Sequence, residues 1–475
     1  MKRFILSTTA ATLACALAFS SGAFESMNSL NTNHSATAPT TPNNATNAEL
    51  FVGHWQGQLK VSEQQKIGFV FNISHTDGEL VATLDVPAQN QFGLPFDKVA
   101  LAGNSLSLAM SAAGIQYKGQ LIDGEIRGEY QQGGFKAPVV LSSTKTAKIR
   151  QAKPQDPSDN PNYQVELVTF KNNKEEHTLS GTITLPNGKV NHTAIILSGS
   201  GPTQRDGEVF GHKVYAVLAD LLTKQGIAVL RFDDRGVGKS GGDFASATSA
   251  DFASDANAAL AFLRKQHRLG DTKIGFIGHS EGSLIASIAI ADAAAPKSDF
   301  FVSLAGPGTS GAQLLIDQSY IIQKMRGMDA EALAQDDRQQ RRLMSAIANG
   351  ASNNEVRQIL VEAGTPQEQL EPKLAQLTSD WMRYFIQTDP KHFLRKISVP
   401  VLAINGDKDL QVVAKQNIGG FIQAVDKQLL TYRIYPDLNH LLQPADKGLP
   451  SEYAKIETTL SPNVVKDIHN WLIQL

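Results

Sequence analysis

The chain has 475 residues, of which 44 are Lys or Arg and 46 are Asp or Glu, so its formal net charge is −2. A chain this close to neutral, without a basic cluster, is poorly suited to bind nucleic acid phosphates or an anionic membrane surface. Its single cysteine excludes an intramolecular disulfide framework, a cysteine-rich zinc site and a cysteine-ligated iron–sulfur cluster. At about 150 residues per domain, the length predicts roughly three structural units.

Residues 1–23 have the organisation of a cleaved secretory signal peptide. Lys2 and Arg3 precede an apolar stretch, and small residues follow at Ser21-Gly22-Ala23. Polar residues interrupt the apolar stretch, so we expect cleavage rather than a permanent membrane anchor. Lipoprotein attachment through Cys15 is a weaker alternative, because the apolar residue expected three positions earlier is missing. We therefore predict an exported protein, periplasmic or secreted, without stable membrane insertion and without a thiol in its mature form.

A β-domain is predicted between two linkers. Residues 24–48 are rich in Asn, Thr, Ser, Ala and Pro and are expected to be a disordered linker. Residues 49–144 alternate apolar and polar side chains with period two, and turn pairs such as Gly103-Asn104 and Asp123-Gly124 separate the runs. This pattern predicts an antiparallel β-barrel or sandwich. Residues 145–162 are a second predicted linker, with prolines among polar residues.

From residue 163 onward, short apolar runs alternate with stretches of helical spacing. The runs are typical of strands buried on both faces of a mainly parallel sheet, which predicts an α/β domain over residues 163–475. The predicted strands are Thr193–Leu197, Ile227–Phe232, Ile274–Ile277, Phe300–Leu304, Val399–Ile404 and Leu429–Tyr435. Residues 309–396 interrupt the alternation with helical sequence, and we predict a helical cap inserted there.

The motif Gly278-His279-Ser280-Glu281-Gly282 is the strongest chemical signal in the chain. It follows a predicted strand and precedes a predicted helix over Ser283–Ala295. A serine on such a tight turn needs glycine two positions to either side, and the turn presents the hydroxyl at the carboxyl edge of the sheet. Ser280 is therefore the candidate nucleophile.

Three further strings accompany this motif, namely Leu179–Pro186, Ser198–Pro202 and Arg205–Gly207. Together they resemble the α/β-hydrolase superfamily across residues 163–475 and, more narrowly, bacterial serine esterases related to acylaminoacyl peptidases. Several such esterases carry an N-terminal β-domain with a Gly-x-Trp motif of the lipocalin-like type, and Gly53-His54-Trp55 has that form. The resemblance implies an α/β-hydrolase fold, a mostly parallel sheet flanked by helices, with the cap inserted and the β-domain preceding it.

A serine nucleophile needs a base and an acid that orients the base, and in this fold they follow the serine in chain order. In α/β-hydrolases the acid usually stands three residues after the glycine that ends its strand, which favours Asp409 over Asp407, a candidate turn residue. His440 follows one further predicted strand and is the predicted base. His469 lies within the predicted final helix, from which it cannot easily reach the edge of the sheet.

Two backbone amides should stabilise the oxyanion. One is expected from Glu281, directly after the nucleophile. By alignment with the family, the other comes from Ser200, with Gly201 as the second choice. Many relatives have a histidine where Ser198 stands, so this turn departs from the family pattern.

The string Asp233–Ser240 contains Gly-x-Gly and Gly-Lys-Ser, but a phosphate-binding loop needs a glycine where Asp233 stands. By resemblance, this string instead braces the nucleophile turn, and Arg205-Asp206-Gly207 supports the oxyanion turn. His279 and Glu281 lack the clustered spacing of metal ligands, so we expect no metal and no organic cofactor.

These observations predict an exported serine carboxylesterase that acts on a small-molecule ester with a short to medium acyl chain. Two alternatives stay open: an exported serine peptidase of the acylaminoacyl or dipeptidyl peptidase type, and a noncatalytic binding protein on a hydrolase scaffold. The physiological ester, the oligomeric state and the role of the β-domain are not specified by the sequence.

Overall fold

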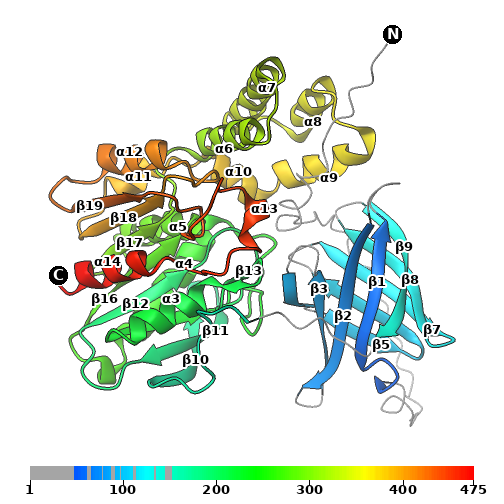
Figure 1. Ribbon diagram of the computed structural model, residues 1–475, viewed down its shortest axis with the longest axis horizontal. Coiled ribbons are helices and arrows are strands. Elements are labelled where there is room, and N and C mark those ends of the chain that lie inside the picture. Colours follow the sequence, from blue (N-terminus) through cyan, green and yellow to red (C-terminus); the bar gives the residue numbers. More distant parts are fainter. Residues whose placement is uncertain are drawn as a thin grey trace, which may run out of the picture. The chain divides into compact units, whose positions relative to one another are not determined.

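The computed structural model describes residues 48–60, 66–76, 79–86, 91–96, 98–110, 114–132, 135–144 and 152–475. The predicted signal peptide, nearly all of the first linker and the start of the second lie outside these residues. The chain divides into two compact units (Figure 1). The first comprises the chain up to Arg150 together with Glu371–Ser379, and the second comprises Gln151–Leu370 and Asp380–Leu475.

The described strands of the first unit form one antiparallel sheet in the order β4-β3-β2-β1-β9-β8-β7-β6-β5. Contacts between β3 and β5 bring the two ends of the sheet together, so it curls into a nearly closed barrel (Figure 1). The strands are β1 Gly53–Lys60, β2 Lys66–Thr76, β3 Glu79–Val86, β4 Gln91–Pro95, β5 Lys98–Ala102, β6 Ser105–Met110, β7 Ile115–Ile122, β8 Glu125–Gln132 and β9 Phe135–Thr144.

Alternating side chains fill the interior of this barrel. Trp55, Phe71 and Tyr117 are buried in one apolar cluster, while Gln56 on β1 and Gln116 and Lys118 on β7 are exposed. The indole nitrogen of Trp55 donates to the Phe51 carbonyl oxygen at 2.7 Å, so its polar atom is satisfied despite burial. Of the two predicted forms, barrel or sandwich, the first unit takes the barrel.

The main sheet of the second unit has the order β10-β11-β15-β12-β16-β17-β18-β19. The strands from β15 to β19 in this order run parallel, and the hairpin β10–β11 pairs antiparallel with β15. The strands are β10 Gln164–Asn172, β11 His177–Leu185, β12 His192–Leu197, β15 Ile227–Phe232, β16 Lys273–His279, β17 Phe301–Leu304, β18 Val401–Gly406 and β19 Leu430–Tyr435, with a separate short hairpin of β13 Glu208–Val209 and β14 His212–Lys213.

Helices cover both faces of this sheet (Figure 1). Residues of α3 and α14 join the apolar cluster on one face, and residues of α4, α5 and α12 join the cluster on the other. The helices outside the predicted cap are α3 Val214–Thr223, α4 Ser249–Arg264, α5 Glu281–Ala291, α12 Ala414–Ala424, α13 Pro450–Tyr453 and α14 Pro462–Leu472, with a 3-10 turn at His267–Leu269. The predicted mostly parallel sheet flanked by helices is confirmed.

The segment between β17 and β18 is helical throughout its described elements. They are α6 Gly311–Met325, α7 Ala330–Ala348, α8 Asn353–Glu362, α9 Gln367–Leu377, α10 Asp380–Gln387 and α11 Lys391–Leu394. Helix α10 packs on α6 and α7. None of the helices in the described part of the chain is both long enough and apolar enough to cross a membrane.

The order of the strands places two loops side by side. Strand β12 lies between β15 and β16, and Leu197 at the end of β12 is in register with Gly278 near the end of β16. The chain therefore reverses its winding direction at β12, and ligands of open parallel sheets bind at such a point. The predicted oxyanion turn and the predicted nucleophile turn leave the sheet there together.

Candidate active site

Ser280 lies on the tight turn between β16 and α5, with φ 54° and ψ −124°. A β-carbon on Gly278 would come within 2.3 Å of the Gly282 carbonyl oxygen, and one on Gly282 within 2.2 Å of the Leu197 carbonyl oxygen. Glycine is required at both positions because any side chain would collide with this backbone. The Ser280 amide donates to the Leu304 carbonyl oxygen at 2.9 Å, which ties the strained turn to β17.

His440 and Asp409 form a buried pair at the same edge of the sheet. His440 Nδ1 lies 2.8 Å from Asp409 Oδ2, and the two side chains are 6% and 0% exposed. The second oxygen, Asp409 Oδ1, accepts hydrogen bonds from the Gln411 and Val412 amides at 2.9 and 2.8 Å. The carboxylate is therefore held in one orientation, in which it can keep the proton of the imidazole on Nδ1 and leave Nε2 free to accept.

Asp407, the alternative acid, has a different environment. It is exposed, and its Oδ1 accepts a hydrogen bond from the Asp437 amide at 2.7 Å. Lys408 Nζ lies 2.6 Å from the Asp437 carboxylate, so these groups stabilise the two neighbouring turns. Among the hydrogen bonds of the described residues, Asp409 contacts His440 and Asp407 does not.

The loop that carries His440 also meets the nucleophile turn. The rings of His279 and His440 lie 5.0 Å apart, and His279 Nε2 lies 3.0 Å from the His440 carbonyl oxygen. In the part of the chain that the structure describes, no hydrogen bond joins the Ser280 hydroxyl to His440. Such bonds are often long in unliganded enzymes and shorten when substrate binds.

The amides near Ser280 differ in whether they have a protein acceptor. The Gly199 amide donates to Tyr215 Oη at 2.9 Å. By contrast, the hydrogen bonds of the described residues include none from the Ser200 or Glu281 amide. Glu281 is the first residue of α5, so its amide has no intrahelical partner and adds to the positive end of the helix. These two amides remain available to an anion.

The side chain of Glu281 is an unexpected part of this region. It is buried, and its Oε1 accepts hydrogen bonds from Ser249 Oγ at 2.6 Å and from Trp381 Nε1 of α10 at 2.8 Å. Burial raises the pKa of the Glu281 carboxyl, and hydrogen bonds from the side chains of Ser200, Ser249 and Trp381 oppose the rise. The residue after the nucleophile thus connects α5 to a helix of the predicted cap. A glutamate in the first turn of an apolar helix was its only signal in the sequence.

The string that begins at Asp233 holds the loop after β12. Asp233 binds Arg205 through both carboxylate oxygens, at 2.9 Å to Nε and 2.6 Å to Nη2. Asp234 accepts from Ser198 Oγ at 2.6 Å and from the Thr203 amide at 2.9 Å. The expectation that this string braces the nucleophile turn is wrong in its target. Among the described residues, the hydrogen bonds of these two carboxylates go to the oxyanion loop and to the Lys239 amide of the string itself, and none goes to the nucleophile turn.

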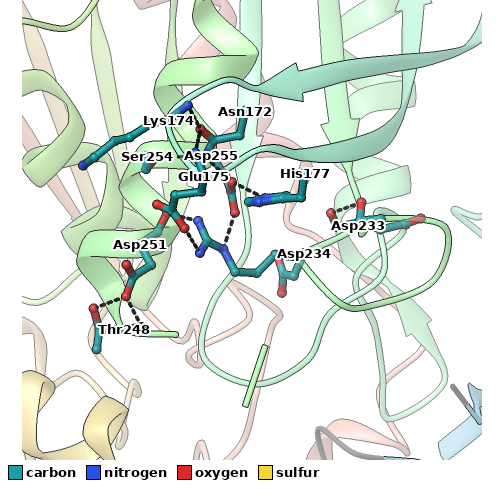
Figure 2. Close-up of polar contacts among 12 residues, drawn as sticks. Asn172, Lys174, Glu175, His177, Asp233, Asp234, Thr248, Asp251, Ser254 and Asp255 are labelled. Atoms are coloured by element: carbon teal, nitrogen blue, oxygen red, sulfur yellow. Dashed lines mark hydrogen bonds and ion pairs between the residues drawn. The ribbon is translucent and has the colours of Figure 1, made fainter. Parts of the chain in front are cut away.

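Arg235 anchors the same string on its other side. Its Nε lies 2.7 Å from Asp255 Oδ2, and its Nη1 also pairs with Glu175. Figure 2 shows Glu175 of the β10–β11 turn, His177 at the start of β11 and Asp255 of α4 close together. His177 Nε2 lies 2.8 Å from Asp255 Oδ1, so the carboxylate of Asp255 has a partner on each oxygen. The buried charges are paired, as stable burial requires.

No group of three or more His, Cys, Asp or Glu side chains that could hold a metal ion occurs among the described residues. The groups gathered around Ser280 are instead a hydroxyl, a histidine–carboxylate pair and two unbonded amides. This combination suits attack on a carbonyl carbon followed by stabilisation of the resulting oxyanion.

The comparisons with known proteins agree with this chemistry. The family model described as serine aminopeptidase, S33 (Hydrolase_4) matches residues 211–446. Esterase EstD of Thermotoga maritima is 23% identical over 301 residues, and the match covers 62% of this chain. The chain spans 66% of the length of that curated relative, just under two thirds.

The comparison with solved structures also found similar proteins. The Pyrococcus furiosus esterase Pf2001 is 17% identical, with 69% of this chain and 100% of that chain covered and a TM-score of 0.41. The esterase domain of a Rhodothermus marinus protein is 17% identical, with 66% and 96% covered and a TM-score of 0.38. The narrower resemblances to acylaminoacyl peptidases and to lipocalin-like barrels stay predictions. The sheet, the nucleophile turn and the family match show that the second unit has an α/β-hydrolase fold, and an antiparallel β-barrel precedes it in sequence. The chain is similar to an esterase.

Proposed function

We propose that the chain is a serine hydrolase that cleaves carboxylic esters through Ser280, His440 and Asp409. The observation that carries the proposal is the arrangement of a strained serine turn beside a buried histidine–aspartate pair. The strand–turn–helix context is the one in which a Gly-x-Ser-x-Gly serine acts as a nucleophile. The order Ser, Asp, His along the chain is the order of α/β-hydrolases.

In the proposed reaction, Ser280 Oγ attacks the ester carbonyl carbon and His440 Nε2 takes the hydroxyl proton. Asp409 stabilises the imidazolium through Nδ1. The amides of Ser200 and Glu281 donate to the oxyanion of the tetrahedral intermediate. His440 then returns the proton to the departing alcohol, and an acyl-enzyme remains on Ser280. Water, activated by His440, releases the acid and restores the serine.

Short to medium acyl chains are the proposed substrates. An apolar cluster of Leu284, Leu314, Phe385 and Val412 joins α5 to two cap helices and to the loop after β18. Trp381 stacks on Phe385 with ring centroids 5.6 Å apart and lies next to Glu281 through its hydrogen bond. Apolar side chains on elements that adjoin the nucleophile turn favour an aliphatic acyl group over a charged one.

Peptide hydrolysis is the second candidate, because the matching family model is described as a serine aminopeptidase. The same nucleophile, base and oxyanion amides serve amide and ester cleavage, so the two activities differ in how the substrate is recognised. A noncatalytic binding role is the third candidate. Export to the periplasm or the medium also belongs to the proposal and rests on residues 1–23 alone.

The test compares the wild-type chain with Ser280→Ala on p-nitrophenyl esters of increasing acyl length and on aminoacyl anilides. We expect ester turnover, and a fall in kcat of about 10⁶-fold in the variant. Ser287→Ala is the matched control, because Ser287 is buried in the same helix and bonds only within it, to the Leu284 carbonyl oxygen. A preference for anilides would favour the peptidase, and no turnover on either panel would favour the binding protein.

A further inference from the structure

A chain of hydrogen bonds through two buried side chains joins the three loops of the candidate site. The Gly199 amide, after β12, lies 2.9 Å from Tyr215 Oη. Tyr215 Oη lies 3.2 Å from His279 Nδ1, and His279 Nε2 lies 3.0 Å from the carbonyl oxygen of His440. Tyr215 comes from α3, on one face of the sheet, so a single tyrosine and a single histidine bridge loops that are far apart in sequence.

The direction of each bond follows from the chemistry of its ends. The His440 carbonyl can only accept, so His279 must carry its proton on Nε2. The Gly199 amide can only donate, so Tyr215 Oη accepts from it and directs its own proton to His279 Nδ1. Burial lowers the pKa of His279 to about 3, which keeps this imidazole neutral and able to accept at Nδ1.

The Tyr215 ring packs closely against Gly207 and His279. Gly207 has φ 63°, and a β-carbon there would lie 2.3 Å from Cδ2 of the Tyr215 ring. The rings of Tyr215 and His279 meet edge to face with centroids 6.0 Å apart. Gly207 belongs to the Arg205–Gly207 string that was expected to support the oxyanion turn, and here it makes the space in which the tyrosine reaches that turn.

We propose that Tyr215 and His279 are positioning residues that set the spacing between the oxyanion loop and the catalytic histidine, by linking the Gly199 amide to the His440 backbone carbonyl. This inference rests on the proposed function of Ser280, His440 and Asp409. It gives His440 two restraints, one on its ring from Asp409 and one on its backbone from His279. It also uses up the Gly199 amide, so a later amide of the loop is left for the oxyanion, that of Ser200 or, as the second choice, that of Gly201.

The test measures kcat and KM separately for ester hydrolysis by His279→Asn, His279→Gln and Tyr215→Phe. Asparagine places its amide near the Nδ1 position and cannot reach His440, whereas glutamine can place a donor near the Nε2 position. We expect His279→Asn to lower kcat by about 100-fold with KM unchanged, because a small displacement of a catalytic group has effects of that size. His279→Gln should restore most of that loss, and Tyr215→Phe should lower kcat by about tenfold.

His212→Gln is the control for loss of a buried, doubly bonded histidine. His212 is fully buried, with Nδ1 2.8 Å from Thr459 Oγ1 and Nε2 2.9 Å from the Tyr453 carbonyl oxygen, and it takes no part in the chain of bonds. This variant should lose thermal stability and keep kcat. Circular dichroism melts of all variants show whether each is folded at the assay temperature.

Wild-type kcat in folded His279→Asn, or equal losses in the Asn and Gln variants, would overturn the proposal. If His279→Asn does not fold, the test rests on Tyr215→Phe, because that variant keeps the aromatic ring. An unchanged kcat in Tyr215→Phe would overturn the proposal as well. Activity that persists in Ser280→Ala would instead overturn the proposed function, and the positioning roles with it. Loss in Ser280→Ala together with a normal His279→Asn would leave the proposed function standing and refute the positioning roles alone.

Discussion

The two units of this protein bury different kinds of side chain. The barrel interior is built from aromatic and aliphatic groups, with Phe71 against Phe96 and Tyr117 at ring distances of 5.1 and 5.3 Å. Among the described barrel residues, Asp85 is the one buried Asp, Glu, Lys, Arg or His. The α/β unit buries many more, including Asp233, Asp234, Arg235, Asp255, His279, Glu281, Asp409 and His440.

The barrel interior therefore serves packing, whereas the α/β unit also buries groups that can take part in chemistry. Burying an ionisable group is costly unless partners compensate it, so such groups persist where they hold a geometry or act on a substrate. In the α/β unit they collect around the loops that follow β12, β15, β16 and β18. The barrel has no comparable set among its described residues, and its stability should depend on apolar burial.

The largest expected effect concerns the choice between two aspartates. Asp409→Asn should lower kcat by about 10⁴-fold, because an amide at this position favours the wrong tautomer of His440. Asp407→Asn, two residues away and exposed, is the matched control and should retain activity. Steady-state ester hydrolysis measures both. A larger loss in the Asp407 variant would assign the acid to Asp407.

Next in size is the loss of the buried Arg235. Arg235→Met should lower the free energy of unfolding by about 3–5 kcal/mol, because it leaves the Asp255 carboxylate buried without its cation. Arg268→Met removes an ion pair with Glu166 in which both side chains are more than a third exposed, and should cost less than about 1 kcal/mol. Urea unfolding compares the two. Equal losses would show that burial does not decide the strength of these pairs.

The free energy of unfolding should depend on pH because of Asp234. Burial raises its pKa to about 8, above the value of about 3.9 for an unfolded aspartate. Between these values the folded state holds a proton that the unfolded state has released. The free energy of unfolding should therefore fall as pH rises from about 4 to about 8, by up to about 1.4 kcal/mol per pH unit.

The Asp234→Asn variant should lack this pH-dependent contribution to the free energy of unfolding. Thermal melts of the two proteins across this pH range measure the difference between them, in which the titration of all other groups largely cancels. Wild-type stability should decline relative to the variant as pH rises. Parallel curves would show that Asp234 does not hold its proton in the folded state.

The smallest expected effect lies in the barrel. Tyr117 is fully buried, and its hydroxyl donates to the Ile126 carbonyl oxygen at 3.0 Å. Tyr117→Phe removes that bond and keeps the ring, so the free energy of unfolding should fall by about 1 kcal/mol. Urea unfolding checks this value. A loss as large as that of Arg235→Met would mean that the barrel also depends on buried polar groups.

The sequence by itself determined the features that depend on neighbouring residues. Period-two alternation was enough to predict the β-domain, because one face of each strand must be apolar. The nucleophile turn followed from glycine spacing, since Gly278 and Gly282 each lie against backbone that leaves no room for a side chain. The apolar runs located β12, β15 and β16 to within two residues, because strands that are buried on both faces are near-continuous runs of apolar residues.

Only the tertiary structure decided which distant groups meet. Spacing after the strand-ending glycine favoured Asp409 over Asp407, but only the structure shows that the Asp409 side chain enters the core beside His440 while Asp407 is exposed. In the link from Gly199 through Tyr215 and His279 to His440, the bonded partners His279 and His440 are 161 positions apart. Hydrogen bonds of this kind depend on how the helices and strands pack, and no local pattern of residues encodes that packing.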